Sequence, residues 1–214
     1  TWWADYNAIL DESGGCSLAL SAWVTLVNQS GASFPNTRLK LVAGEVNRAP
    51  QPAPPPIPYA VKRMEMAAVA DGFEESGLFE YHLYTLGRRT DLPDNSTKQI
   101  ELLPAADRVE CTQQLVFTAA PEPMFFGQPN LEQGLAATSE GVVGAWLEFD
   151  NSKDNGLGVA LPAGRLRVNQ LDPADGSLEF IGEDVIGHTP RNETLRIKLG
   201  NAFDIVGELI FKAT

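Results

Sequence analysis

The sequence contains few of the residues that build metal and redox sites. Among its 214 residues there are two cysteines and two histidines, and Cys16 and Cys111 form no Cys-x-x-Cys pair. Histidines this few and far apart do not indicate a zinc site, and no cofactor is expected. The Gly-x-Ser-x-Gly elbow of many hydrolases is also missing from the sequence. Common metal-dependent and serine-dependent chemistries are therefore disfavoured.

Basic residues are scarce beside acidic ones. The chain has 16 Lys and Arg residues against 28 Asp and Glu residues, a formal net charge of -12, and the basic residues are dispersed. A polyanion would meet net repulsion, so neither nucleic acid nor an anionic lipid surface is an expected partner. No run of about 20 apolar residues occurs, which excludes a transmembrane segment within this chain. The start at Thr1, without initiator Met or leader, is what we expect of a mature or excised fragment.

The sequence does contain segments in which apolar residues recur at every second position, as in β-strands. From residue 142 to 211, short apolar runs alternate with Asp, Asn, Pro and Gly clusters, which predicts strands at 142–149, 165–171, 177–186 and 195–199. Gly182 interrupts one of these runs and is a candidate β-bulge. The N-terminal part predicts strands at 2–10, 17–27, 37–42, 78–86, 98–103 and 108–117. The strand at 17–27 is apolar on both sides and is expected to be central.

One stretch interrupts this pattern. Residues 49–58 hold six prolines in ten positions, which neither a helix nor a sheet accommodates. We expect a loop of poor order between 46 and 76, with a short helix at 59–70 and an acidic loop at 71–76. Residues 119–140 lack clean periodicity and are expected to cross between sheets.

These patterns predict an all-β fold, either a β-sandwich or two packed antiparallel β units with Greek-key or meander connections and few short helices. Hydrophobic content of 43% and charged content of 21% are typical of a globular protein. A length of 214 residues suits one β-rich domain. A subdivision into a first unit at 1–120, with its Pro-rich loop at 46–76, and a second at 136–214 is the alternative.

Catalytic candidates are weak. His188 has Asp184 four residues before it, and an imidazole oriented by a carboxylate can serve as a general base. A turn histidine bonded to the backbone is the preferred interpretation. Glu183 and Asp184 would supply the two carboxylates of a glycosidase, but neighbours on a strand point to opposite faces.

A calcium loop is a second weak candidate. Asp150, Ser152 and Asp154 place oxygen donors at alternate positions, as a Ca²⁺ loop requires. However, Asn155 stands where an EF-hand loop needs Gly, and Leu161 where it needs a bidentate Glu. An ordinary loop is therefore preferred.

The two cysteines leave two alternatives. Buried free thiols are preferred, because sequence alone cannot place Cys16 and Cys111 within bonding distance. A disulfide between them would suit an oxidising compartment and would close a long loop.

Several segments carry a family resemblance. These are WWADYNAIL at 2–10, AWVTLVNQSGASFPNTRLKLVAGEV at 22–46, LPAGRLRVNQLDPADGSLEFIGEDVIGHTP at 161–190 and LRIKLGNAFDI at 195–205. Together they resemble the C-terminal domain of the domain of unknown function 4139 family, which includes mucoidy-inhibitor-A-like bacterial proteins. The resemblance implies a bacterial, exported protein with an N-terminal β or coiled-coil portion, and it assigns no catalytic residue.

The expected function is that of a non-enzymatic β module in a periplasmic or cell-envelope protein. Its role would be structural or the binding of a protein partner, which includes its own N-terminal domain. The alternatives are a carbohydrate-binding or Ca²⁺-dependent adhesion module and, ranked lower, a hydrolase that uses His188. Clustered exposed aromatic side chains would favour sugar binding.

Overall fold

The computed structural model of the protein describes residues 1–44, 72–118 and 138–210. In these residues every regular element is a strand, which confirms the all-β fold class. The proline-rich stretch at 49–58, the expected helix at 59–70 and most of the expected crossover at 119–140 lie outside the described residues.

The largest sheet has eight strands. They are β1 (Trp2–Asp11), β2 (Ser17–Asn28), β8 (Ser96–Thr118), β9 (Thr138–Asp150), β10 (Gly164–Leu171), β11 (Leu178–Ile186), β12 (Thr194–Asn201) and β13 (Gly207–Ile210). The order is β11-β10-β1-β2-β8-β9-β12, with β13 also paired to β9. As predicted, β2 is central, and strands from both halves of the chain share this sheet.

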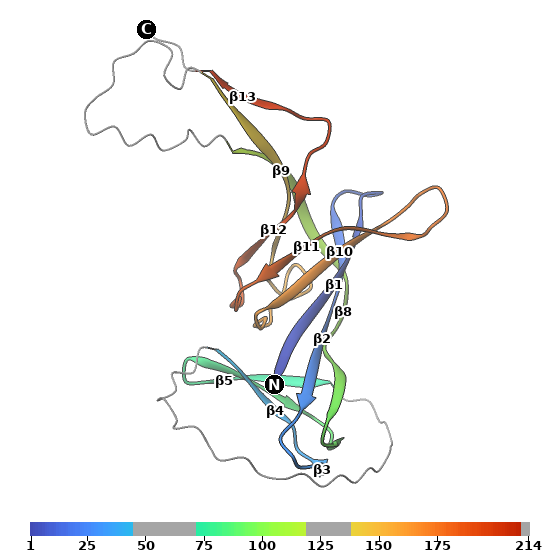
Figure 1. Cartoon of the computed structure of the whole chain (residues 1–214), viewed down its shortest axis with the longest axis vertical. Coiled ribbons are helices and arrows are strands. Elements are labelled where there is room, and N and C mark those ends of the chain that lie inside the picture. Colours follow the sequence, from blue (N-terminus) through green and yellow to red (C-terminus); the bar gives the residue numbers. More distant parts are fainter. Residues whose placement is uncertain (45–71, 119–137, 211–214) are drawn as a thin grey trace, which may run out of the picture.

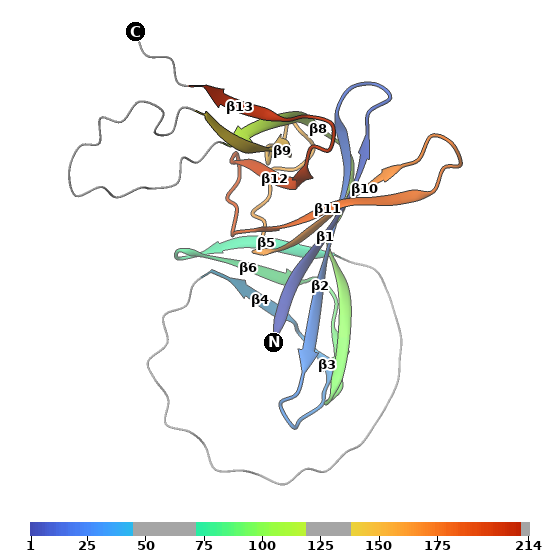
Figure 2. The same cartoon turned by 45° about the horizontal axis from the view of Figure 1, so that its top comes forward.

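Two small sheets complete the described structure. One pairs β3 (Phe34–Thr37) with β7 (Thr90–Leu92), and the other contains β4 (Lys40–Ala43), β6 (Tyr81–Leu86) and β5 (Phe73–Leu78) in the order β4-β6-β5. The three-stranded sheet lies near the N-terminal end of β1, whereas β13 lies at the opposite end of the molecule (Figures 1 and 2). Near the N-terminal end the fold therefore has two packed layers.

Three local expectations were wrong. Residues 71–76 were expected to be a loop, but Phe73–Leu78 is strand β5. One strand was expected at 78–86, but a turn at Phe79 separates β5 from β6 there. Residues 98–103 and 108–117 are one long strand, β8, instead of two. The ladder to β2 continues past Pro104 through several register shifts, because bulges absorb a residue that lacks a donor.

The pairing of β1 with β10 is parallel, with Asp5 opposite Arg165, and it departs from the expected antiparallel connections. This pair joins the first strand to a strand more than 150 residues later in the chain. The inward side chains of β1, namely Ala4, Tyr6, Ala8 and Leu10, are all buried in one continuous core.

The two edges of the eight-stranded sheet approach each other, because β11 contacts β12. At the contact, the backbone N–H of Lys198 donates to the Asp184 carboxylate at 2.9 Å. Gly182 lies so close to β12 that a Cβ added there would sit 2.4 Å from the Leu199 carbonyl oxygen. The ladder shifts register opposite Gly182, which confirms the predicted bulge. The sheet is therefore rolled up, and its edges are held together without a shared ladder.

We predict that Gly182→Ala lowers the free energy of unfolding by about 1 to 3 kcal/mol, because the methyl group must push β11 away from β12. Gly187→Ala is the matched control, since a Cβ at Gly187 meets nothing within 4 Å. Urea unfolding of both variants checks this. Equal stability of the two variants would contradict the close approach.

Candidate functional site

The loops at 151–163 and 187–194 meet at a fully buried side chain, Asn151. Its amide nitrogen donates to the carbonyl oxygens of Val159 at 2.6 Å and Pro190 at 2.8 Å. Its amide oxygen accepts from the backbone N–H of Gly158 at 3.2 Å. A buried amide that lost these partners would be left unsatisfied, so Asn151 fixes both loops to each other.

Two buried tyrosines bond to the loop at 151–163 from the core. Tyr6 donates its hydroxyl to the Pro162 carbonyl oxygen at 2.7 Å, and Tyr84 donates to the Ala160 carbonyl oxygen at 2.9 Å. Burial raises the pKa of both hydroxyls well above the ordinary value. Both tyrosines are therefore neutral donors that position the loop.

A third attachment comes from Glu75 on β5. Its carboxylate accepts from His82 at 2.9 Å and from Arg191. Burial alone would raise the pKa of Glu75, but the hydrogen bonds from Arg191 and His82 outweigh it and the pKa lies below its ordinary value. Glu75 thus links the three-stranded sheet to the loop at 187–194 as a carboxylate.

His188 and Asp184 do not form a catalytic pair in this arrangement. The Nδ1 atom of His188 accepts the backbone N–H of Ala163 at 3.0 Å. Asp184 accepts instead from the backbone N–H groups of Val185 and Lys198. In a catalytic His–Asp dyad, Nδ1–H donates to the carboxylate and Nε2 accepts a proton from the substrate. Here Nδ1 is itself an acceptor, so the neutral ring carries its proton on Nε2, and Nε2 is not available as the base. The contact fits a turn histidine.

Glu183 and Asp184 are likewise occupied by different partners. The Glu183 carboxylate is 3.1 Å from Arg167 Nε and 3.8 Å from an Arg165 nitrogen on β10. Asp184 contacts β12. The two carboxylates therefore serve separate contacts and are not arranged as an acid and base around one bond.

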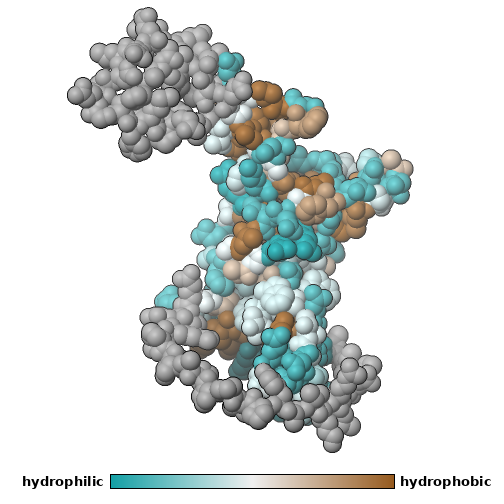
Figure 3. All heavy atoms as spheres, in the orientation of Figure 1, coloured by the Kyte–Doolittle hydropathy of each residue, from teal (hydrophilic) through white to brown (hydrophobic). Residues whose placement is uncertain are grey.

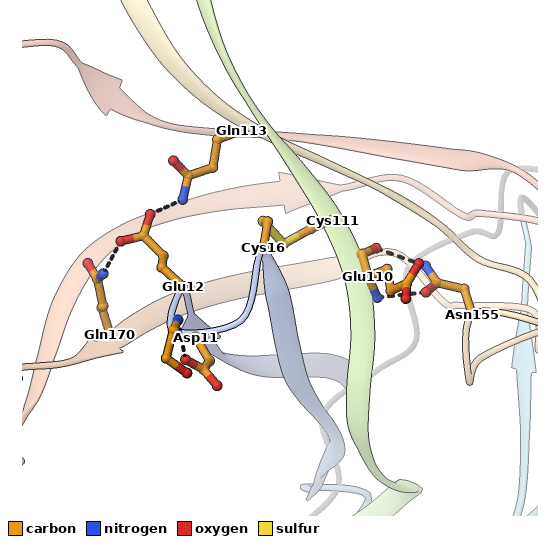
Figure 4. Close-up of a disulfide and its surroundings, with 9 residues drawn as sticks. Asp11, Glu12, Cys16, Glu110, Cys111, Gln113, Asn155 and Gln170 are labelled. Carbon is orange, nitrogen blue, oxygen red and sulfur yellow. Dashed lines mark hydrogen bonds between the residues drawn. A yellow bond between two sulfur atoms is a disulfide. The ribbon is translucent and has the colours of Figure 1, made fainter.

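The Asp150–Asp154 loop is held by protein groups. Asp150 accepts from the Thr194 hydroxyl at 2.6 Å, while Asp154 is exposed. Asn155 receives the backbone N–H of Glu110 at 2.6 Å and donates to the Glu110 carbonyl oxygen at 3.0 Å (Figure 4). Thus the residue that departs from the EF-hand pattern fastens this loop to β8.

A pocket of about 350 Å³ lies beside that loop and is partly acidic. Its acidic lining residues are Glu110, Glu148, Asp150 and Asp154. Glu148 pairs with Arg196 at 3.0 Å. Within residues 1–44, 72–118 and 138–210, no group of three His, Cys, Asp or Glu side chains is arranged to hold a metal ion.

The structure joins Cys16 and Cys111 by a disulfide, so the preferred interpretation as free thiols was wrong. The Cα atoms are 5.0 Å apart, and Cys111 donates its backbone N–H to the Cys16 carbonyl oxygen at 3.0 Å. β2 and β8 bring the two residues together, although 95 positions separate them in the sequence. Only this long-range pairing determines their proximity, which explains the failure of sequence reasoning.

Beyond the disulfide, a cavity of about 480 Å³ opens at the end of the rolled sheet. Leu115, Trp146 and Leu199 contribute to its wall. Glu12 accepts hydrogen bonds from Gln170 at 2.7 Å and from Gln113 (Figure 4). Its carboxylate therefore connects the β1–β2 turn to both β10 and β8. The alternating pattern indicated these strands, but the position of Glu12 between them depends on the roll.

Comparison with known proteins finds no matching protein-family profile, no matching curated protein and no matching solved structure. In the described ranges, the structure contains no helix long and apolar enough to cross a membrane.

We predict that removing the disulfide, by reductant or by Cys16→Ser with Cys111→Ser, lowers the free energy of unfolding by about 4 kcal/mol. The reason is that the bond closes a long loop in the unfolded chain. Thermal melts with and without reductant measure the effect. The double variant is the control, since its melting temperature should not respond to reductant. An unchanged melt of the wild-type protein after verified reduction would contradict the prediction.

Proposed function

We propose that the chain is a non-enzymatic β module of a bacterial periplasmic or envelope protein and that it binds a protein partner. The observation that carries the proposal is an exposed apolar surface on the ribbon formed by the end of β8 with β9 and β13. We call this surface the apolar ribbon. It comprises Leu115 and Phe117 of β8 together with Phe203, Ile205 and Val206 of the connection between β12 and β13.

The strands beneath the apolar ribbon form a piece of sheet, and the connection at 202–206 leads into its strand β13. Gly141 of β9 pairs with Gly207 of β13, and the Phe117 ring lies over both. A Cβ added at Gly207 would sit 2.0 Å from that ring. The Phe117 ring can therefore pack on β9 and β13 only because Gly141 and Gly207 have no side chain. This packing fixes β13 to β9.

The connection that leads into β13 carries large, apolar, exposed side chains. Phe203 is 98% exposed and Val206 is 85% exposed. Apolar atoms gather toward the β13 end of the molecule in Figure 3. Clustered apolar side chains on the surface of a water-exposed protein are typical of interaction sites.

Backbone groups on this ribbon add to the proposal. In the described part of the chain, β13 pairs with β9 alone, so its second edge offers N–H and C=O groups to an added strand. Addition of a strand supplies backbone hydrogen bonds, and apolar pockets beside it supply selectivity. A β-rich partner, which includes an N-terminal β portion of the same protein, fits this surface.

Two observations support the proposed compartment. A disulfide between Cys16 and Cys111 persists in oxidising compartments such as the bacterial periplasm. The resemblance of residues 161–190 and 195–205 to an exported bacterial family supports the same location. Backbone contacts of His188 and Asp184 support a structural role for both, which is why the module is proposed to be non-enzymatic.

We predict that a photo-crosslinking phenylalanine analogue at Phe203 of the full-length protein gives a discrete crosslinked product in cells. Val42, 39% exposed on β4 of the small sheet, is the matched control position and should give none. Mass spectrometry of the product identifies a separate partner, the same protein's N-terminal portion or a second copy. The first two identities support the proposal.

Phe203→Ser with Val206→Ser should abolish a crosslink placed at Ile205 while changing stability by less than about 0.5 kcal/mol, because both side chains are exposed. A second copy as sole product, no product, or equal products at Phe203 and Val42 would overturn the proposal.

A further inference from the structure

The outer face of the main sheet carries a second surface, separate from the apolar ribbon, around Trp23. Strand register places Arg165, Asp5, Trp23 and Glu101 in one row across β10, β1, β2 and β8. Neighbouring rows add further side chains to this face. We call the set the Trp23 platform; it comprises Trp3, Asp5, Asn7, Trp23, Thr25, Gln99, Glu101, Arg165 and Arg167.

The platform lies on the outer face of β2, the strand whose two sides are both apolar in sequence. Trp23 is 42% exposed and Trp3 is 43% exposed, although the inward residues of β2 are buried. Trp3 lies opposite Thr25 and Trp23 opposite Asp5, so the two indoles are diagonal neighbours on one face. Both tryptophans therefore remain partly open to solvent in the middle of a sheet.

The platform is hollowed beside Trp23. A groove of about 380 Å³ is lined by Trp23, Asp5, Asn7, Gln99, Arg165 and Arg167, together with Tyr6. The row from Arg165 to Trp23 spans two interstrand spacings, or roughly 10 Å. One wall of this groove is an aromatic ring, and the others are planar hydrogen-bonding groups.

Hydrogen bonds within the platform hold these groups in place. Thr25 donates to the Asp5 carboxylate at 3.1 Å, and Gln99 donates to the Thr25 hydroxyl at 3.1 Å. Asn169 donates to the amide oxygen of Asn7 at 2.8 Å. Side chains that are already ordered lose little entropy when they bind a ligand.

Charges on the platform largely cancel. Glu183 pairs with Arg167 at 3.1 Å and lies 3.8 Å from Arg165. Asp5 and Glu101 add negative charge in the row that contains Arg165. A strongly charged ligand has no excess of opposite charge to meet here, whereas a neutral ligand rich in hydroxyl groups finds both donors and acceptors.

We propose that the Trp23 platform binds a neutral saccharide. The C–H face of a pyranose ring stacks on the electron-rich face of an indole, and its hydroxyls bond to carboxylate, amide and guanidinium groups. A groove with one apolar wall and a few fixed polar groups is the usual form of a small-ligand site. A protein partner would have to desolvate the charged rows over an interface of about 800 Å² per side, which makes this face a poor protein-binding surface.

Isothermal titration of the disulfide-intact protein with maltotetraose, cellotetraose and chitotetraose tests the proposal. We expect saturable binding of at least one of them. Trp23→Ala should weaken that binding on the order of tenfold or more, and Trp23→Phe should restore part of it because a ring face remains. Gln99→Ala is a second variant that leaves the indole in place and should also weaken binding.

Trp146→Phe, on β9 outside the platform, is the matched control and should bind as the wild-type protein does. Thermal melts establish that each variant is folded before titration. No binding of any of the three saccharides by the folded wild-type protein, or equal binding by Trp23→Ala and Trp146→Phe, would overturn the proposal. Neither result bears on the crosslink at Phe203, so the two proposals fail separately.

Discussion

The contact between the two edges of the main sheet is the constraint on which the rest of the structure depends. An open sheet leaves unpaired backbone groups on its outer strands, and proteins must cover or close such edges. Here β11 meets β12 through the Asp184 carboxylate, which accepts the Lys198 N–H, and through the side-chain-free surface of Gly182. Closing the roll buries the inward side chains of both strands, and it brings the loops at 151–163 and 187–194 together around Asn151.

The roll also decides which surfaces remain for binding. Inward side chains fill one core, which leaves the outer face of the sheet and the apolar ribbon as exposed surfaces. Polar groups that could act as catalysts, among them His188 and Asp184, are used to hold backbone segments. The Trp23 platform and the apolar ribbon are exposed instead, one of them polar around an indole and the other apolar. The two binding proposals therefore concern surfaces of different chemical character.

Sequence reasoning located most strands because the period of two is a local property, and it recognised the bulge at Gly182 for the same reason. It failed at 71–76, where acidic residues suggested a loop but Glu75 is stabilised by Arg191, a partner far along the chain. Residues 98–103 and 108–117 were predicted to be two strands, although bulges carry β8 through Pro104 as one strand. The disulfide, the parallel β1–β10 pair and both surfaces proposed for binding arise from long-range pairing. No short window of sequence contains that information.

The most direct test of the rolled sheet is hydrogen exchange at the backbone amide of Lys198, measured by NMR in the wild-type protein, Asp184→Ala and Asp184→Asn. The account predicts slow exchange in the wild-type protein, exchange faster by on the order of tenfold or more in Asp184→Ala, and partial protection in Asp184→Asn, which keeps an acceptor. The amide of Cys111, bonded to the Cys16 carbonyl oxygen, serves as an internal reference and should not change. Fast and equal exchange of Lys198 in all three proteins would contradict the contact between β11 and β12.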